Sequence, residues 1–202
     1  MKISVELVPR DAQSLEKEVH TVHQAFPKLD MINIPDLPRF SLRSWEGCSI
    51  SKKYYENNVP HLRAIDFDLN KPLPFEAHLT AHGIDKVLIL KGDAPQDLSK
   101  RVYPSNTLEM IKKIKRELPN VKVYAAIDQF RGSLRSEYDY IQQKKEAGAD
   151  GFFTQPFFDI RLLAIYAEFL RDTEVFWGIS PVTSEKAQSY WETKNHAVFP
   201  TD

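Results

Sequence analysis

The chain has 202 residues, of which 42% are hydrophobic and 27% charged, so it can form one globular domain with a substantial core. Its formal net charge of −1 gives no sequence-wide attraction to nucleic acid or to a membrane surface, and we expect neither as a partner. Cys48 is the single cysteine, which excludes an internal disulfide and suits a reducing compartment. With no signal-peptide pattern and no apolar run of about 20 residues, we expect a cytoplasmic protein.

Short β-rich runs alternate with longer helix-patterned stretches along the chain. The runs predicted as strands are 3–8, 31–34, 62–67, 86–90, 122–127, 151–154 and 174–179. The stretches predicted as helices are 11–26, 75–83, 105–118, 136–148 and 160–172. Helix 105–118 has the clearest pattern, because Ser105 is a suitable N-cap and apolar residues follow it at helical spacing.

This alternation predicts an α/β fold with a parallel sheet. An open doubly wound sheet normally has a glycine-rich turn after its first strand, and the first strand here ends "VELVPR" without a nearby glycine. We therefore favour a TIM (β/α)8-type barrel that forms a single domain over residues 1–202. About seven β/α units are recognisable, so the barrel is expected to lack the eighth unit or to be truncated in it.

Polar side chains lie at or near the end of almost every predicted strand. Active sites of β/α barrels are built at the carboxyl ends of the strands. The residues with these polar side chains are Glu6, Asn33, Asp36, His61, Arg63, Asp66, Lys91, Asp93, Asp128, Gln129, Arg131, Thr154, Gln155 and Ser180. Loops are polar in most proteins, so an ordinary turn would explain any one strand end taken alone, including Gly92-Asp93.

Glu6 is harder to explain as a loop residue, because it lies inside an apolar strand. A carboxylate that faces the barrel interior is costly unless it is paired or protonated, and one that faces the helices is no better solvated. A buried glutamic acid with a raised pKa is suited to general acid catalysis. Glu6 is therefore a candidate catalytic acid.

Other residue types give weaker indications. His61 alone is most simply a structural histidine, and His20 and His23 lack the spacing of a helical metal pair, so no metal site is expected. The aromatic residues of "GFFTQPFFD" are mostly core residues. One ring near the strand end is a candidate for stacking on a flat ligand.

Several of these strand ends together resemble the methylenetetrahydrofolate reductase family. "SVELVPR" resembles its first strand, "VPHLRAID" its third and "ILKGDAP" the Gly-Asp segment after its fourth. "KKEAGADGFFTQPFFD" is similar to the sixth-strand region, and "GISPVTSEKAQ" resembles the seventh. The order and spacing hold from Ile3 to about Gln188, and the fourth- and sixth-strand motifs are the most specific.

The resemblance implies a barrel that binds FAD and uses NADH or NADPH to reduce 5,10-methylenetetrahydrofolate to the 5-methyl form, in one-carbon metabolism and methionine biosynthesis. Carried over by position, Glu6 would be the acid that opens the methylene bridge. Asp93 would lie between flavin and folate and contact both, and Gln155 would contact the folate, with Phe158 beside it. The residues that would contact the cofactor, besides Asp93, are His61, Glu137 and Lys144.

Two segments differ from the family pattern. "INIPDLPR" replaces the usual end of the second strand, and "AIDQFRGS" replaces the usual loop after the fifth. They keep two other hypotheses open: a folate-binding member without redox activity, serving a methyltransferase partner, or an inactive relative that acts through protein contacts. "IPDLPR" is similar to a stretch in members fused to methyltransferase modules. The sequence does not fix the oligomeric state, and a homo-oligomer is one expectation.

Overall fold

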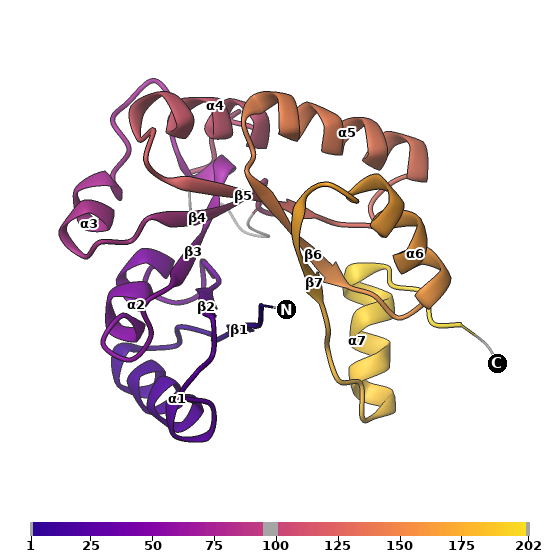
Figure 1. Cartoon of the computed structure of the whole chain (residues 1–202), viewed down its shortest axis with the longest axis horizontal. Helices are drawn as coiled ribbons and strands as arrows, with labels where there is room; N and C mark the ends of the chain where they lie inside the picture. Colours follow the sequence, from indigo (N-terminus) through magenta and orange to yellow (C-terminus); the bar gives the residue numbers. More distant parts are fainter. Residues whose placement is uncertain (1, 95–100, 201–202) are drawn as a thin grey trace.

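The computed structural model, which describes residues 2–94 and 101–200, is a nearly closed barrel of seven parallel strands surrounded by helices (Figure 1). The strands lie in the order of the sequence, and each pairs in parallel with the next. This confirms the predicted TIM-type α/β barrel without its eighth unit. The elements are β1 (Ser4–Glu6), α1 (Ala12–Ala25), β2 (Met31–Ile34), α2 (Ser44–Ser51), β3 (Asn58–Arg63), α3 (Glu76–Ala81), β4 (Lys86–Leu90), α4 (Thr107–Glu117), β5 (Lys122–Ile127), α5 (Leu134–Ala147), β6 (Gly151–Pro156), α6 (Ile160–Phe169), β7 (Glu174–Gly178) and α7 (Glu185–Asn195).

Alternating side chains of the strands form two apolar layers. One face of the sheet packs against the surrounding helices, as Ile32 and Ile34 of β2 do together with Leu15 and Val19 of α1. The side chains on the other face fill the barrel interior below the strand ends with a separate cluster of Met31, Val59, Leu88, Tyr124 and Phe176. This alternation fixes which residues of each strand end can reach the interior.

Three local predictions require correction. The third strand is Asn58–Arg63 rather than 62–67, because residues 64–66 form a 3-10 turn and Pro60, an unfavourable strand residue, lies inside the real strand. The N-cap of α4 is Asn106, whose side chain accepts from the Glu109 amide, while the Ser105 hydroxyl donates to the Phe67 carbonyl. Helices α2 and α7 were not predicted, since neither "SWEGCSIS" nor "EKAQSYWETKN" has a clear apolar stripe.

The barrel wall is open between β1 and β7, which lie on either side of the gap in Figure 1. Residues of both strands line a cavity of about 940 Å³ that we call the seam. Where β1 and β7 begin, which we call the lower end of the seam, Lys2 Nζ lies 2.8 Å from Glu174 Oε1. The same carboxylate accepts a hydrogen bond from Lys122. Side chains thus join the two sheet edges at the position where an eighth strand would pair with both.

The helices are short and mostly amphipathic. Within residues 2–94 and 101–200, none of them has the length and apolar character required to span a bilayer.

Candidate functional site

A cavity of about 830 Å³ occupies the mouth of the barrel, where the strands end. Six of the predicted site residues contribute to its lining: Glu6, His61, Asp93, Glu137, Lys144 and Gln155. Phe158 lies outside this lining, and its ring packs against those of Trp191 and Phe199. Glu6, Asp93 and Gln155 therefore line one cavity at the same end of the barrel, although they are far apart in the sequence.

Glu6 lies at the end of β1 and is less enclosed than its sequence suggests. Its side chain is 55% exposed, because the seam leaves one side of β1 uncovered. The surrounding walls of the mouth still displace much of the bulk water, and this desolvation raises the pKa of the carboxyl. Glu6 thus combines access for a ligand with a pKa above the ordinary value for a glutamic acid.

His61 of β3 is the neighbour of Glu6 across the mouth, with 4.0 Å between Nε2 and Glu6 Oε2. The ring is buried, and burial lowers the pKa of His61 to about 3, so the imidazole is neutral at physiological pH. Nε2 lies 2.9 Å from Oδ1 of Asn33, whose Nδ2 donates to Ser4 Oγ at 2.8 Å. Asn33 is thus part of the site, although its sequence position indicated only a strand end.

Asp93 follows β4 at the rim and is held by two arginines. Arg131 Nη2 donates to Asp93 Oδ1 at 2.6 Å, while Arg63 donates to its backbone carbonyl. Gly92 makes this approach possible, because it has φ of +84° and a Cβ there would lie 2.7 Å from Arg63 Nε. Gly92 is therefore required by the packing of a buried arginine against the backbone as well as by the turn.

Arg131 also pairs with Asp128, its Nε lying 3.0 Å from Asp128 Oδ2. It comes from the β5–α5 loop, so it connects the ends of β4 and β5 on the cavity wall. Gln129, from the same loop, holds the end of β6. Its Nε2 donates to the carbonyls of Gln155 and Pro156 at 2.9 Å each. These bonds fix the end of β6, where Gln155 lines the cavity.

Glu137 and Lys144 form a buried pair on α5 beneath the same wall. Lys144 Nζ lies 3.6 Å from Glu137 Oε1, donates to the Ala126 carbonyl at 2.8 Å and lies 3.9 Å from the centroid of the Tyr140 ring. Burial lowers the pKa of Lys144 to about 8 and raises the pKa of Glu137, despite their mutual attraction. Glu137 Oε1 is buried, and it faces the Lys144 ammonium rather than the open part of the cavity.

The mouth has features that fit a flavin dinucleotide. Lys91 and Lys144 line the mouth and supply cationic groups for phosphates, while Arg131 is already paired with Asp93 and Asp128. The volume of about 830 Å³ lies within the range of cofactor sites. For a metal ion, by contrast, residues 2–94 and 101–200 bring together no group of three His, Cys, Asp or Glu side chains.

Helix α7 contributes side chains that sequence reasoning missed. Tyr190, Trp191 and Asn195 line the mouth, and Trp191 also lines the seam. The seam and the mouth share Glu6 and Gln155 as well. No apolar periodicity marks this helix, so only its position beside the gap reveals that it borders the site.

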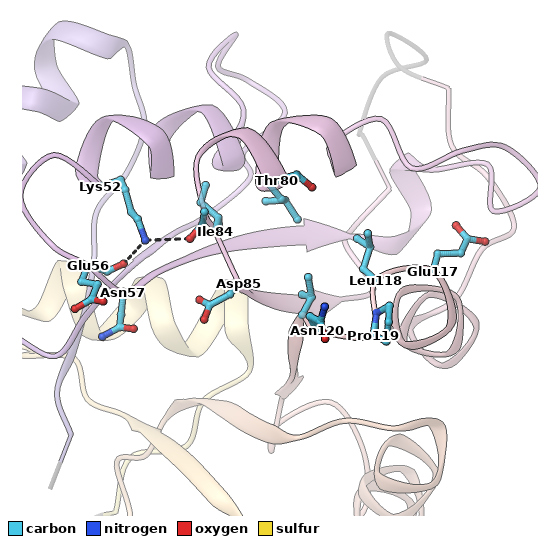
Figure 2. A pocket seen from close by; sticks show the side chains of 13 residues that line it. Lys52, Glu56, Asn57, Thr80, Ile84, Asp85, Glu117, Leu118, Pro119 and Asn120 are labelled. Atoms are coloured by element: carbon cyan, nitrogen blue, oxygen red, sulfur yellow. Dashed lines mark hydrogen bonds between the residues drawn. The ribbon is translucent and has the colours of Figure 1, made fainter.

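Another cavity, of about 480 Å³, lies at the opposite end of the barrel, next to the residues that precede β3, β4 and β5 (Figure 2). Lys52 crosses it and donates to the carbonyls of Glu56 and Gly83 at 2.7 and 3.0 Å. None of the predicted site residues lies there. This end of a β/α barrel is normally concerned with stability rather than with catalysis.

A β/α barrel whose mouth carries a carboxyl of raised pKa, a neutral imidazole and cationic rim groups is a suitable scaffold for a cofactor-dependent enzyme. The sequence profile of the methylenetetrahydrofolate reductase family matches residues 44–201 of this chain. The chain therefore belongs to the methylenetetrahydrofolate reductase family.

Individual relatives agree with this assignment at low identity. The 5,10-methylenetetrahydrofolate reductase of Buchnera aphidicola subsp. Schizaphis graminum (strain Sg) is 27% identical over 112 residues, which cover 55% of this chain and 38% of that protein. The enzyme of the same name from Escherichia coli (strain K12) is 26% identical over 133 residues, covering 63% of this chain and 45% of that protein. The matched region thus spans less than half the length of these two relatives.

Solved structures support the architecture. The carboxyl transferase domain of Rhizobium etli pyruvate carboxylase, in complex with oxamate and biotin, has a TM-score of 0.62 and 13% identity, covering 97% of this chain and 39% of that chain. At this identity the likeness shows the barrel fold alone.

Proposed function

We propose that this protein takes part in the reduction of 5,10-methylenetetrahydrofolate to 5-methyltetrahydrofolate, with FAD as cofactor and NADH or NADPH as electron donor. The observation that carries the proposal is that Glu6, Asp93 and Gln155 line one cavity at the barrel mouth of a member of this family. The cytoplasm is the proposed location, and the product would serve methionine biosynthesis.

Glu6 is proposed as the proton donor to a nitrogen of the methylene bridge. Its raised pKa increases the protonated fraction at any given pH, and its exposed carboxyl can approach a ligand. Proton donation opens the bridge to an iminium carbon, which is the electrophile that the reduction needs. Gln155 offers an amide donor and acceptor for the heterocycle, and Asp93 offers a carboxylate whose position is fixed by Arg131.

Residues on the β4 and α5 sides of the mouth are proposed to hold the flavin. His61, Asp93, Glu137 and Lys144 line the cavity, and Lys91, which lines it as well, supplies a cationic group for phosphates. When bound, the flavin supplies the hydride transfer.

A visible absorption spectrum of protein reconstituted with FAD tests the proposal. We expect a yellow protein that is bleached by NADH or NADPH and regains its colour on addition of 5,10-methylenetetrahydrofolate. A protein that retains the flavin but is never reoxidised by the folate would contradict the substrate assignment.

The second candidate is folate binding without redox activity, in support of a methyltransferase. It is favoured by the Arg131–Asp93 ion pair, because Arg131 already binds the carboxylate that the first candidate places beside the flavin. A colourless protein would support it if folate quenched the fluorescence of Trp191, which lines both the mouth and the seam. Loss of that quenching in Trp191→Phe but not in Trp45→Phe would place the folate in the cavity, because Trp45 packs against Phe67 and Phe75 elsewhere.

A further inference from the structure

A chain of hydrogen bonds runs beneath Glu6 from β3 to β1. It joins His61 Nε2 to Asn33 Oδ1 at 2.9 Å and Asn33 Nδ2 to Ser4 Oγ at 2.8 Å. Asn33 and His61 are 5% and 9% exposed, so water cannot readily replace these contacts. Asn33 belongs to the "INIPDLPR" segment, which departs from the family pattern.

The direction of the first bond follows from the second. The Asn33 amide nitrogen donates to Ser4, which leaves its carbonyl oxygen to face the imidazole. A carbonyl oxygen can only accept, so His61 Nε2 must carry the hydrogen. A neutral imidazole has one N–H, and in this tautomer it is directed at Asn33.

Glu6 lies within reach of the same nitrogen but receives no hydrogen bond from it. The distance of 4.0 Å from His61 Nε2 to Glu6 Oε2 is too long for one. In the part of the chain that the structure describes, His61 is the partner that comes within ion-pair distance of Glu6. Lys2 and Glu174 border the same seam at its lower end, while the facing residues of β6, Thr154 and Gln155, are uncharged.

We propose that Asn33 is a positioning residue, which holds the His61 N–H away from Glu6 so that Glu6 keeps its proton for the substrate. A hydrogen bond from His61 would stabilise the carboxylate and weaken the acid. The catalytic part of this inference rests on the proposed function, whereas the effect of Asn33 on Glu6 does not.

Nitrogen-15 NMR of labelled histidine tests the tautomer in the unmodified protein. We expect Nε2 to be protonated and Nδ1 to be the unprotonated nitrogen of His61, with the signals assigned by their absence in His61→Gln. A protonated Nδ1 would overturn the proposal, whatever any variant does.

Carbon-13 NMR of the glutamate carboxyls then measures the consequence for Glu6, assigned by comparison with Glu6→Gln. Asn33→Leu keeps the size of the side chain but removes the acceptor, so the titration midpoint of Glu6 should move to lower pH. Asn57→Leu is the matched control, because Asn57 donates to the Asp30 carbonyl at the far end of the barrel (Figure 2). An unchanged midpoint in folded Asn33→Leu would refute the proposal. Asn33→Asp, which keeps an acceptor, should retain the Nε2–H tautomer even if Asn33→Leu does not fold.

The activity readout separates this inference from the function itself. A midpoint one pH unit lower leaves about one tenth of the protonated Glu6 at neutral pH, so folate reduction should fall about tenfold. If the wild type has no reductase activity but the NMR results hold, the proposed function fails and the role of Asn33 stands. If activity is present but Asn33→Leu leaves its pH profile unchanged, the positioning role fails alone.

Discussion

Arg131 and Asp93 form an ion pair of 2.6 Å across the rim of the barrel mouth, and this pair joins the loop after β5 to the end of β4. Both side chains are largely exposed, at 51% and 83%, so the pair should contribute little to stability. Because the pair lies beside the cavity, we expect it to affect ligand binding more than it affects stability.

We expect Arg131→Gln to weaken folate binding several-fold while changing the free energy of unfolding by less than about 1 kcal/mol. The carboxylate of Asp93 would lose the partner that orients it, and the cavity would lose a positive charge. Ligand titration and urea unfolding measure the two effects. Arg135→Gln is the control, since Arg135 pairs with Asp139 on the outer face of α5. A similar loss of binding in both variants would contradict a specific role for Arg131.

Glu6→Gln should reduce the rate of folate reduction by about 100-fold or more, because the amide cannot donate an acidic proton. Oxidation of the nicotinamide, which needs no such proton, should be spared. The pKa of Glu6 is raised, so in the wild type the protonated, active form prevails at low pH and the rate should decline as pH rises through that pKa. Stopped-flow measurement of each half-reaction across pH tests both statements. Equal loss of the two half-reactions would exclude Glu6 as the specific acid.

Glu174→Gln should destabilise the barrel by about 1 to 2 kcal/mol at neutral pH. Burial alone would raise the pKa of Glu174, but hydrogen bonds from Lys122 and Lys2 outweigh it and lower this pKa to about 2. The carboxylate therefore stabilises the folded state fully above pH 4.5, and this contribution is lost as pH falls toward 2. Thermal unfolding of both proteins between pH 7 and 2 should show a difference that shrinks with acidification. Glu168→Gln, in an exposed pair with Arg171, should show almost none.

Lys144→Met should cost about 3 kcal/mol of unfolding free energy, because it leaves the Glu137 carboxylate buried without a cation. The double variant Lys144→Met with Glu137→Gln should recover much of the loss, since neither charge remains. A double-mutant cycle by chemical denaturation measures the coupling. Additive effects of the two substitutions would show that the pair does not act as a unit.

The strand pattern was readable from the sequence where apolar runs are continuous. "KVLIL" of β4 and "KVYAAI" of β5 are largely buried on both faces, which is why the predicted bounds agree with the structure. The third strand was misplaced because Pro60 interrupts its pattern. Helix α7 has no buried residues and carries no apolar signal, so only the folded chain could reveal it.

The site was predictable to the extent that strand ends converge in any β/α barrel. This rule brought Glu6, Asp93 and Gln155 to one mouth without information on contacts. The relation of Asn33 to His61 and that of Arg131 to Asp93 depend on side-chain directions across neighbouring strands, which no periodicity specifies. The high exposure of Glu6 follows from the missing strand and was contrary to the burial expected from its apolar neighbours.

The gap between β1 and β7 has a consequence for the supply of protons. Glu6 borders both the mouth and the gap, so a ligand that fills the mouth need not isolate its carboxyl from solvent. If Glu6 donates a proton in each turnover, as proposed, solvent in the gap between β1 and β7 could reprotonate it while the ligand is still bound. In a fully closed barrel, the same proton exchange would have to take place through the mouth, which the bound ligand occupies.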